Sequence, residues 1–220
     1  MDTAPSPATT VRYPGRGRYD RATIDAILDA GFLAHVGLVA ADGRPVVVPM
    51  LYARRGDEVL IHGSPATRLV RSLKAGAEVC LTVTHLDGLV LARSAFHHSA
   101  NYRSVVVLGR ARYLDDLGER AAALAAITDR IVPHRADHLR PMTDKEVRAT
   151  AVLAVPLTEA SAKVRTGPPV DDDEDYALPI WGGTIPVVTT FGEPSDDGRN
   201  LDGVAIPEHV RAMVGSCVTG

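Results

Sequence analysis

The chain has 220 residues, of which 45% are hydrophobic and 23% are charged, and its formal net charge is -3. These values suit a globular protein with a full core, and the lack of a basic surplus argues against nucleic acid as a partner. Its two cysteines, Cys80 and Cys217, lie far apart, which indicates neither a disulfide framework nor a cysteine-based metal site. No apolar run reaches membrane-spanning length. We therefore expect a cytoplasmic protein with no membrane partner.

Residues 1–18 are rich in Pro, Gly and Arg and are predicted to form a flexible tail. Asp20 then stands where a helix N-cap is expected, and Ile24, Ile27 and Leu28 share one face of the helix that follows, which ends near Gly31. Such an amphipathic helix is expected to act as a lid over a sheet.

Three strand-like segments follow, joined by short turns containing Asp42-Gly43 and Arg55-Gly56-Asp57. They cover residues 32–40, 44–53 and 57–62. This spacing predicts an antiparallel meander. Pro49 cannot donate a ladder hydrogen bond, so it marks an edge or a bulge where unpaired backbone could contact a ligand.

A polar turn follows the third of these strands. Ser64 is a preferred N-cap residue and Pro65 suits the first helical position. Backbone N–H groups at such a helix start can bind an anion, while Thr67, Arg68 and Arg71 add a hydroxyl group and positive charge. The segment indicates a phosphate cradle, although an ordinary capped surface helix explains these residues at least as well.

The rest of the chain combines strand patterns with few helices. The Ser64 helix is expected to end near Lys74, and Asp116 is expected to cap a helix that runs to Ile131. Thr143 can cap another short helix. Strand patterns cover residues 78–84, continue from 89, and cover 102–114 and 151–156. Because the turns between the early strands are too short for crossover helices, the sequence predicts a mainly β fold, a β-barrel.

Composition changes after residue 167, and residues 168–220 are predicted to form an extended arm and tail. The acidic run Asp171 to Asp175 is expected to be a solvated face rather than a metal site. Trp181 is the only tryptophan and lies in a segment that cannot form its own core. Its ring is expected either to anchor the arm on a neighbouring surface or to pack on the barrel of its own chain.

A second polar cluster runs from Ser99 to Ser104, directly before an apolar run. Strand alternation places Tyr102 and Ser104 on one face and Arg103 on the other. The cluster could therefore line a pocket while Arg103 reaches a phosphate or a partner chain. A loop that enters a strand explains the pattern equally well.

The histidines do not suggest a metal site. His97 and His98 are adjacent, and His134 and His138 lie in an irregular segment that lacks the glutamate of a zinc-protease motif. We expect no bound metal. His62 ends a strand directly before the Ser64 turn, so it is expected either to hydrogen-bond a ligand there or to cap strand backbone. No nucleophile elbow or dinucleotide-binding glycine motif is present, so no catalytic residue is assigned.

Three segments together resemble the pyridoxamine 5'-phosphate oxidase-like, FMN-binding split-barrel superfamily, within the branch related to nitroimidazole-resistance proteins. The first combines Val48-Pro49-Met50 with Ile61-His62-Gly63-Ser64, and the second runs from Asp87 to Val105. The third combines the segment from Ser161 to Arg165 with Pro179-Ile180-Trp181-Gly182-Gly183. The resemblance spans residue 19 to about residue 194.

This resemblance implies a six-stranded split β-barrel over residues 19–167 that forms a homodimer, with two FMN sites at the interface and the arm reaching the partner. It places Val48, Pro49 and Met50 along the flavin ring, His62, Gly63 and Ser64 near its polar edge and ribityl chain, and Thr67 and Arg68 at the phosphate. The residues that complete the pocket are Ser99, Tyr102, Arg103 and Ser104. Lys163, Arg165 and Trp181 are implied to reach the flavin of the other subunit, although Lys163 and Arg165 fit alternating surface charges equally well.

The implied activity is that of an FMN-dependent oxidoreductase, which moves a hydride between the flavin and a small organic substrate, with nitro compounds as one option. The C-terminal region lacks the basic pair that holds substrate phosphate in the vitamin oxidases, which argues against vitamin oxidation. Two alternatives stay open: a flavin-binding or haem-binding carrier or sensor without turnover, and a deazaflavin-dependent reductase.

Overall fold

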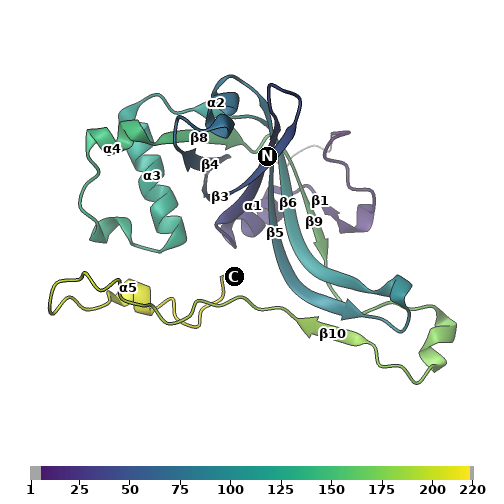
Figure 1. Ribbon diagram of the computed structural model, residues 1–220. Helices are drawn as coiled ribbons and strands as arrows, with labels where there is room; N and C mark the ends of the chain where they lie inside the picture. Colours follow the sequence, from purple (N-terminus) through teal and green to yellow (C-terminus); the bar gives the residue numbers. More distant parts are fainter. Residues whose placement is uncertain (1–5, 219–220) are drawn as a thin grey trace.

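The computed structural model describes residues 6–218. The fold is mainly β, with ten strands in a single antiparallel sheet that curls into a split barrel (Figure 1). The strands are β1 (Gly17–Arg18), β2 (Leu33–Val39), β3 (Pro45–Arg55), β4 (Glu58–Gly63), β5 (Glu78–Leu91), β6 (Ser99–Arg110), β7 (Arg112–Tyr113), β8 (Ala151–Pro156), β9 (Glu159–Arg165) and β10 (Gly183–Pro186).

Five α-helices flank the sheet within the described residues. They are α1 (Arg21–Asp29), α2 (Arg68–Lys74), α3 (Leu117–Ile131), α4 (Asp144–Ala149) and α5 (Glu208–Arg211). Four short 3-10 helices add to them: η1 (Pro14–Arg16), η2 (Ala95–His97), η3 (Ala136–His138) and η4 (Asp173–Ala177). None of the helices in residues 6–218 combines the length and apolar character needed to cross a membrane.

The strand order is β1-β9-β6-β5-β2-β3-β4-β8-β7, and β10 pairs with the far half of β5. The expected meander is confirmed, because β2 pairs with β3 and β3 pairs with β4, each antiparallel. Ten strands replace the six that were expected. The additional ones include β1, β7 and β10, which have two to four residues each and are too short to show a periodic pattern.

Two apolar clusters lie on opposite sides of the sheet. The larger one fills the barrel under α1, whose buried side chains are the expected Ile24, Ile27 and Leu28. Inside it, the Tyr52 hydroxyl donates a 2.6 Å hydrogen bond to the carbonyl of Leu28. The smaller cluster packs α3 against β4 and β8. Side chains cap the helices as expected: Asp20 accepts from the Thr23 amide, Asp116 from the Glu119 amide, and Thr143 forms a full capping box.

The strand expected over residues 102–114 is divided in the structure. Its first part belongs to β6, which begins earlier, at Ser99, and ends at Arg110. The short strand β7 then pairs with β8 instead of continuing along β5. Gly109 has φ +150°, a conformation that few side chains permit, and it lets the chain change direction between the two pairings.

The far halves of β5 and β6 leave the barrel as a curved ribbon with β10 beside them, and η2 and η4 lie near its tip (Figure 1). From here on, the arm means this projection, and only η4, β10 and the chain between them come from the segment 168–220 that the sequence predicted to be extended. From residue 187 the chain runs back beneath the barrel toward α5. Phe191 stacks on Phe32 at 6.2 Å between ring centroids, and His209 stacks on His138 at 4.3 Å.

The two segments at the chain ends differ from what the sequence indicated. The predicted tail over residues 1–18 lies partly outside the described residues, and from Ser6 it packs on the sheet: Thr9 is buried, and β1 pairs with β9. In the acidic run, the Asp171 side chain has no exposed surface, which corrects the expectation of a fully solvated face. Its carboxylate accepts hydrogen bonds from the backbone and the guanidinium of Arg93.

Candidate functional site

The turn after β4 differs from the predicted helix start. Ser64 does not cap α2, because its carbonyl accepts the Thr67 amide at 3.0 Å and closes a β-turn with Pro65 at the second position. Thr67 is the N-cap, and its hydroxyl oxygen accepts the Val70 amide at 3.3 Å. The helix therefore starts at Arg68, three residues later than a Ser64 cap would place it. The turn and both hydroxyl groups stay at the surface.

Arg68 and Arg71 lie one helical turn apart on α2, and both side chains are exposed. Neither guanidinium forms an ion pair or a hydrogen bond with another part of residues 6–218. By contrast, Arg54 pairs with Asp29, and Arg112 pairs with Glu58 and Glu119. The two arginines beside the turn thus keep their charge available for an anion.

The two edges of β3 have different strand partners near this turn. Residues 45–51 pair with β2 and residues 52–55 pair with β4, so no described strand pairs with the second edge of Val48, Pro49 and Met50. Pro49 thus lies at an edge, as predicted. Alternation separates the three side chains: Val48 and Met50 pack against the core, while Pro49 is exposed beside His35. A planar ligand can contact all three residues only along this free backbone edge.

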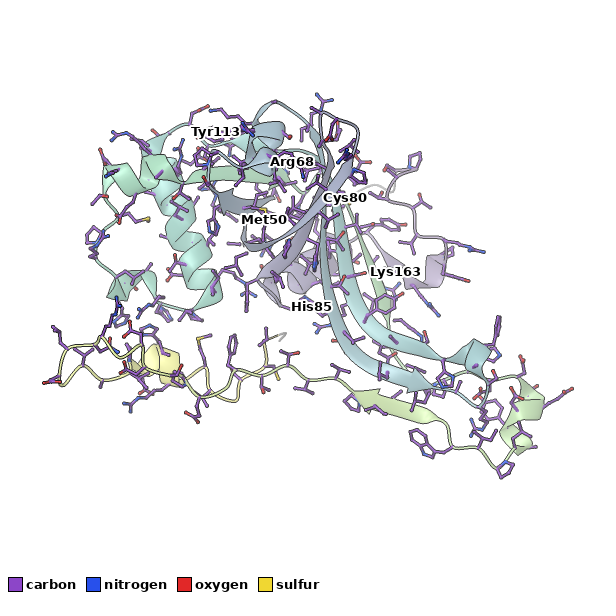
Figure 2. The ribbon with its side chains drawn as sticks, in the orientation of Figure 1. Met50, Arg68, Cys80, His85, Tyr113 and Lys163 are labelled. Atoms are coloured by element: carbon purple, nitrogen blue, oxygen red, sulfur yellow. The ribbon has the colours of Figure 1, made fainter. Side chains whose placement is uncertain are left out.

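Gly63 brings the end of β4 close to β3 and α2. A Cβ at this position would lie 3.2 Å from Val70 Cγ2 and 3.8 Å from Met50 Cε, so a larger residue would press against both elements. Figure 2 labels Met50, which lies on β3, and Arg68, which is the first residue of α2. His62 shares a strand face with Leu60, toward α3. Burial lowers the pKa of His62, and its Nδ1 is buried without a hydrogen-bond partner.

The second polar cluster lies on β6 and β9, away from α2. Tyr102 and Ser104 share the outer face with Lys163: the Lys163 ammonium lies 5.6 Å from the Tyr102 ring centroid, and Ser104 donates a 3.3 Å hydrogen bond to the Lys163 carbonyl. Arg165 donates to the Asn101 side chain and to the carbonyl of Gly167. The pKa of Arg165 is lowered by burial and by the nearby charge of Arg16.

Arg103 and Ser99 lie on β6, and Trp181 lies between η4 and β10. Arg103 forms an ion pair with Asp87 at 2.9 Å, so this carboxylate already neutralises the charge that was expected to reach a phosphate. Ser99 lies in the arm, opposite Val90. Trp181 also lies in the arm, is 67% exposed, and does not pack on the barrel of its own chain.

The predicted site residues therefore form two groups that one chain does not bring together. The first group surrounds the free edge of β3 and the turn before α2: Val48, Pro49, Met50, His62, Gly63, Ser64, Thr67 and Arg68. The second lies along β6, β9 and the arm: Ser99, Tyr102, Arg103, Ser104, Lys163, Arg165 and Trp181. Figure 1 shows α2 at the opposite end of the molecule from the arm tip.

The outer face of the sheet holds a cavity that the sequence did not single out, which we call the sheet-face cavity. Its volume is about 800 Å³. The polar or reactive side chains in its wall include His35, Cys80 and Thr82, and its apolar side chains include Val39 and Val47. His35 is exposed between the buried residues Ala34 and Val36. This alternation is the one signal in the sequence that could have identified it.

The fold is that of a split-barrel protein, and the free β3 edge beside the basic helix α2 is its candidate ligand site. The family model for pyridoxamine 5'-phosphate oxidase matches residues 20–164. The chain therefore belongs to the pyridoxamine 5'-phosphate oxidase family. No curated protein matches it.

Two solved structures resemble nearly the whole chain. The flavocytochrome Anf3 from Azotobacter vinelandii is 47% identical, covers 96% of this chain and 98% of its own, and has a TM-score of 0.90. The FAD and heme binding protein from Mycobacterium smegmatis is 38% identical, covers 93% and 100%, and has a TM-score of 0.88. A putative 5-nitroimidazole antibiotic resistance protein from Bacteroides thetaiotaomicron is 24% identical, covers 67% and 86%, and has a TM-score of 0.58, which shows a shared fold.

Proposed function

We propose that this protein is a homodimeric redox protein that binds a flavin nucleotide together with a haem. The observation that carries the proposal is the likeness, over more than nine tenths of each chain, to one protein described as a flavocytochrome and to another described as binding FAD and haem. The likeness favours FAD over the FMN that was first expected. It also favours the haem-binding alternative, now combined with flavin.

The separation of the predicted site residues supports a dimer. One chain supplies the β3 edge, the Ser64 turn and Arg68, while its Lys163 lies on β9 and its Trp181 lies in the arm, between η4 and β10. In a two-fold dimer, the second group of one chain meets the first group of the other, and two equivalent sites result. Exposed apolar side chains on the outer face, Val39 at 64% and Val47 at 63%, give such a contact its apolar surface.

The residues beside α2 fit a flavin. The free backbone edge at Val48, Pro49 and Met50 offers hydrogen-bonding groups to the edge of a planar ring. Thr67 and Arg68 suit a phosphate, because a hydroxyl and an unpaired guanidinium both donate to its oxygens. The half-buried His62, whose pKa is lowered by burial, lies on the α3 side of β4, so we assign its side chain no contact with the flavin.

The sheet-face cavity fits a haem. Haem iron in proteins takes an axial imidazole or another side-chain donor. His35 is exposed in the wall of this apolar cavity, and no hydrogen bond or ion pair within residues 6–218 engages its ring. Gly37, two residues further on the same face, has no side chain to obstruct a planar group. His35 would be the residue that holds the haem iron in this cavity.

When bound, a flavin can accept two electrons as a hydride and release them one at a time, and a haem iron exchanges one electron at a time. The protein's part is to hold both groups close together and to exclude water. The free β3 edge lies next to the sheet-face cavity, because Pro49 on that edge and His35 in the cavity wall are partners in the β2–β3 ladder. This adjacency favours a redox protein over a carrier of a single group.

The test is the absorbance spectrum of the full-length protein purified after expression with haem supply. We expect flavin bands together with a Soret band, and a shift of the Soret band when NADH or NADPH is added without oxygen. His35→Ala should remove the Soret band and keep the flavin bands. His98→Ala is the matched control, since that ring is exposed and bonds Ser94 through its Nδ1.

Other outcomes would contradict separate parts of the proposal. Flavin binding would be refuted if the protein is colourless and neither FMN nor FAD raises its thermal stability. Flavin bands without a Soret band would refute haem binding. Loss of the Soret band in His62→Ala but not in His35→Ala would move the axial contact to the other side of the sheet.

A further inference from the structure

A second cavity lies between the turn that joins β2 to β3 and the helix α2, and we call it the hairpin cavity. Its volume is about 630 Å³, within the range of pockets that bind small molecules. Its lining residues are Val39, Ala40, Ala41, Asp42, Arg68, Arg71, Ser72, Ala75, Gly76 and Ala77. Arg68 connects this cavity to the Ser64 turn.

The hairpin cavity has two guanidinium groups with no partner in residues 6–218. Arg68 and Arg71 lie three residues apart on one side of α2, and both line the cavity. The single phosphate of FMN needs only Arg68, the arginine that directly follows Thr67. Arg71 lies one turn further from the β3 edge, so it is placed for a second phosphate in line with the first.

Beyond the arginines the lining changes in charge and polarity. Asp42 contributes a carboxylate that remains about half exposed: its Oδ1 accepts the Arg44 amide at 3.2 Å, and its Oδ2 lies 3.9 Å from the exposed Arg44 guanidinium. A carboxylate repels further phosphates but accepts hydrogen bonds from ribose hydroxyls or from an amino group. The remaining wall is largely apolar, formed by Val39 and several alanines. A chain of inorganic phosphates does not fit this order of groups, whereas two phosphates followed by ribose and a base do.

We propose that the hairpin cavity binds the adenosine monophosphate half of FAD, with Arg71 on its phosphate, Asp42 on its ribose or adenine amino group, and the Thr67–Arg68 turn on the phosphate next to the ribityl chain. The proposal rests on the flavin binding proposed above and deepens it. In this proposal the hairpin cavity distinguishes FAD from FMN by the adenosine monophosphate half of FAD, and not by the flavin ring, which both nucleotides share.

The test compares the two flavins on the full-length protein after its own flavin has been removed. Titrations with FAD and with FMN, followed by flavin fluorescence, give both dissociation constants. We expect the wild type to bind FAD more tightly than FMN. Arg71→Ala should weaken FAD binding roughly tenfold to a hundredfold and leave FMN binding unchanged, because it removes one charge-assisted phosphate contact. Arg68→Ala should weaken both.

Lys74→Ala is the matched control for removing a positive charge from α2. The Lys74 ammonium lies 4.0 Å from the Tyr113 ring centroid, and Lys74 does not line the hairpin cavity. A second readout is competition: AMP should displace FAD and fail to displace FMN, and Asp42→Ala should weaken the competition.

Three results would overturn the assignment. The first is FMN binding as tight as FAD binding, and the second is an equal loss of affinity for both flavins in Arg71→Ala. The third is displacement by AMP of both flavins or of neither. If neither flavin binds the wild type, the proposed function fails, and this subsite fails with it. Binding of FMN alone would retain the flavin site and refute the hairpin cavity as an adenosine site.

Discussion

The ring of His85 lies directly against Gly31, so closely that a Cβ on Gly31 would stand 2.5 Å from His85 Cε1. His85 is 4% exposed, and its Nε2 lies 2.9 Å from the carbonyl oxygen of Ile27. Because a carbonyl can only accept, Nε2 must carry the proton. The ring thereby joins α1, which covers the barrel, to β5, which continues into the arm.

Gly31→Ala should lower the free energy of unfolding by about 1–3 kcal/mol, the usual cost of forcing an additional methyl group into a packed site. The ring cannot move away without losing its hydrogen bond to Ile27. Urea unfolding followed by circular dichroism measures the change. Gly192→Ala is the control, because a Cβ there meets no atom within 4 Å. Equal stability of the two variants would show that His85 can shift at little cost.

Stability should fall as the pH drops from 7.5 to 5. Burial lowers the pKa of His85 below its ordinary value of 6.5, and burial also lowers the pKa values of His62 and His209. The unfolded chain then binds more protons than the folded chain, so the contribution of these rings is complete above pH 6.5 and is lost as the pH falls through the folded pKa values.

Urea unfolding at several pH values between 7.5 and 5 measures this slope. His85→Gln keeps a side-chain donor for the Ile27 carbonyl but cannot titrate, so its stability should depend less on pH than that of the wild type. His98→Gln, which replaces an exposed imidazole in the arm, is the control for the substitution itself. A slope in His85→Gln as steep as that of the wild type would rule out His85 as a source of the pH dependence.

Asp171→Ala should release the chain between Gly167 and β10 from the arm. The Asp171 carboxylate holds the backbone amide and the guanidinium of Arg93, and that guanidinium lies 4.7 Å from the Tyr176 ring centroid. Limited proteolysis with mass spectrometry should show faster cleavage within residues 168–187. Asp173→Ala removes an exposed carboxylate of the same run and should be cleaved like the wild type. Equal cleavage of all three proteins would argue against a role for Asp171 in fixing the segment.

Val47→Asp should convert the proposed dimer to a monomer. Val47 is 63% exposed on the outer face of β3 in the single chain and lines the sheet-face cavity, so an aspartate is tolerated there unless a haem or a second copy covers it. In a dimer it would place an unpaired charge in an apolar contact. Light scattering after size exclusion measures the mass. Leu201→Asp, at a position that is 80% exposed in the C-terminal segment, should stay dimeric. A monomeric wild type would remove the basis for a shared site.

Sequence patterns located most elements because they depend on local chemistry. Capping at Asp20, Asp116 and Thr143 follows from side chains that bond their own helix start. The shift of the α2 start from Ser64 to Thr67 could not be read in advance, since both residues can cap and the choice depends on the turn that Pro65 forms. The site residues were grouped by the resemblance rather than by periodicity, because contacts between distant strands leave no trace in local spacing.

The sequence by itself determined the mainly β class, the antiparallel meander and the basic turn after β4, because short turns, alternation and capping act within a few residues. Only the tertiary structure decided which residues share a site. It left one edge of β3 free, placed His35 beside Pro49, paired Arg103 with Asp87, buried Asp171, and carried Trp181 away from α2. The first three depend on strand register and on where the pairing of two strands stops, and the last two depend on contacts between segments far apart in the chain; local sequence patterns encode neither.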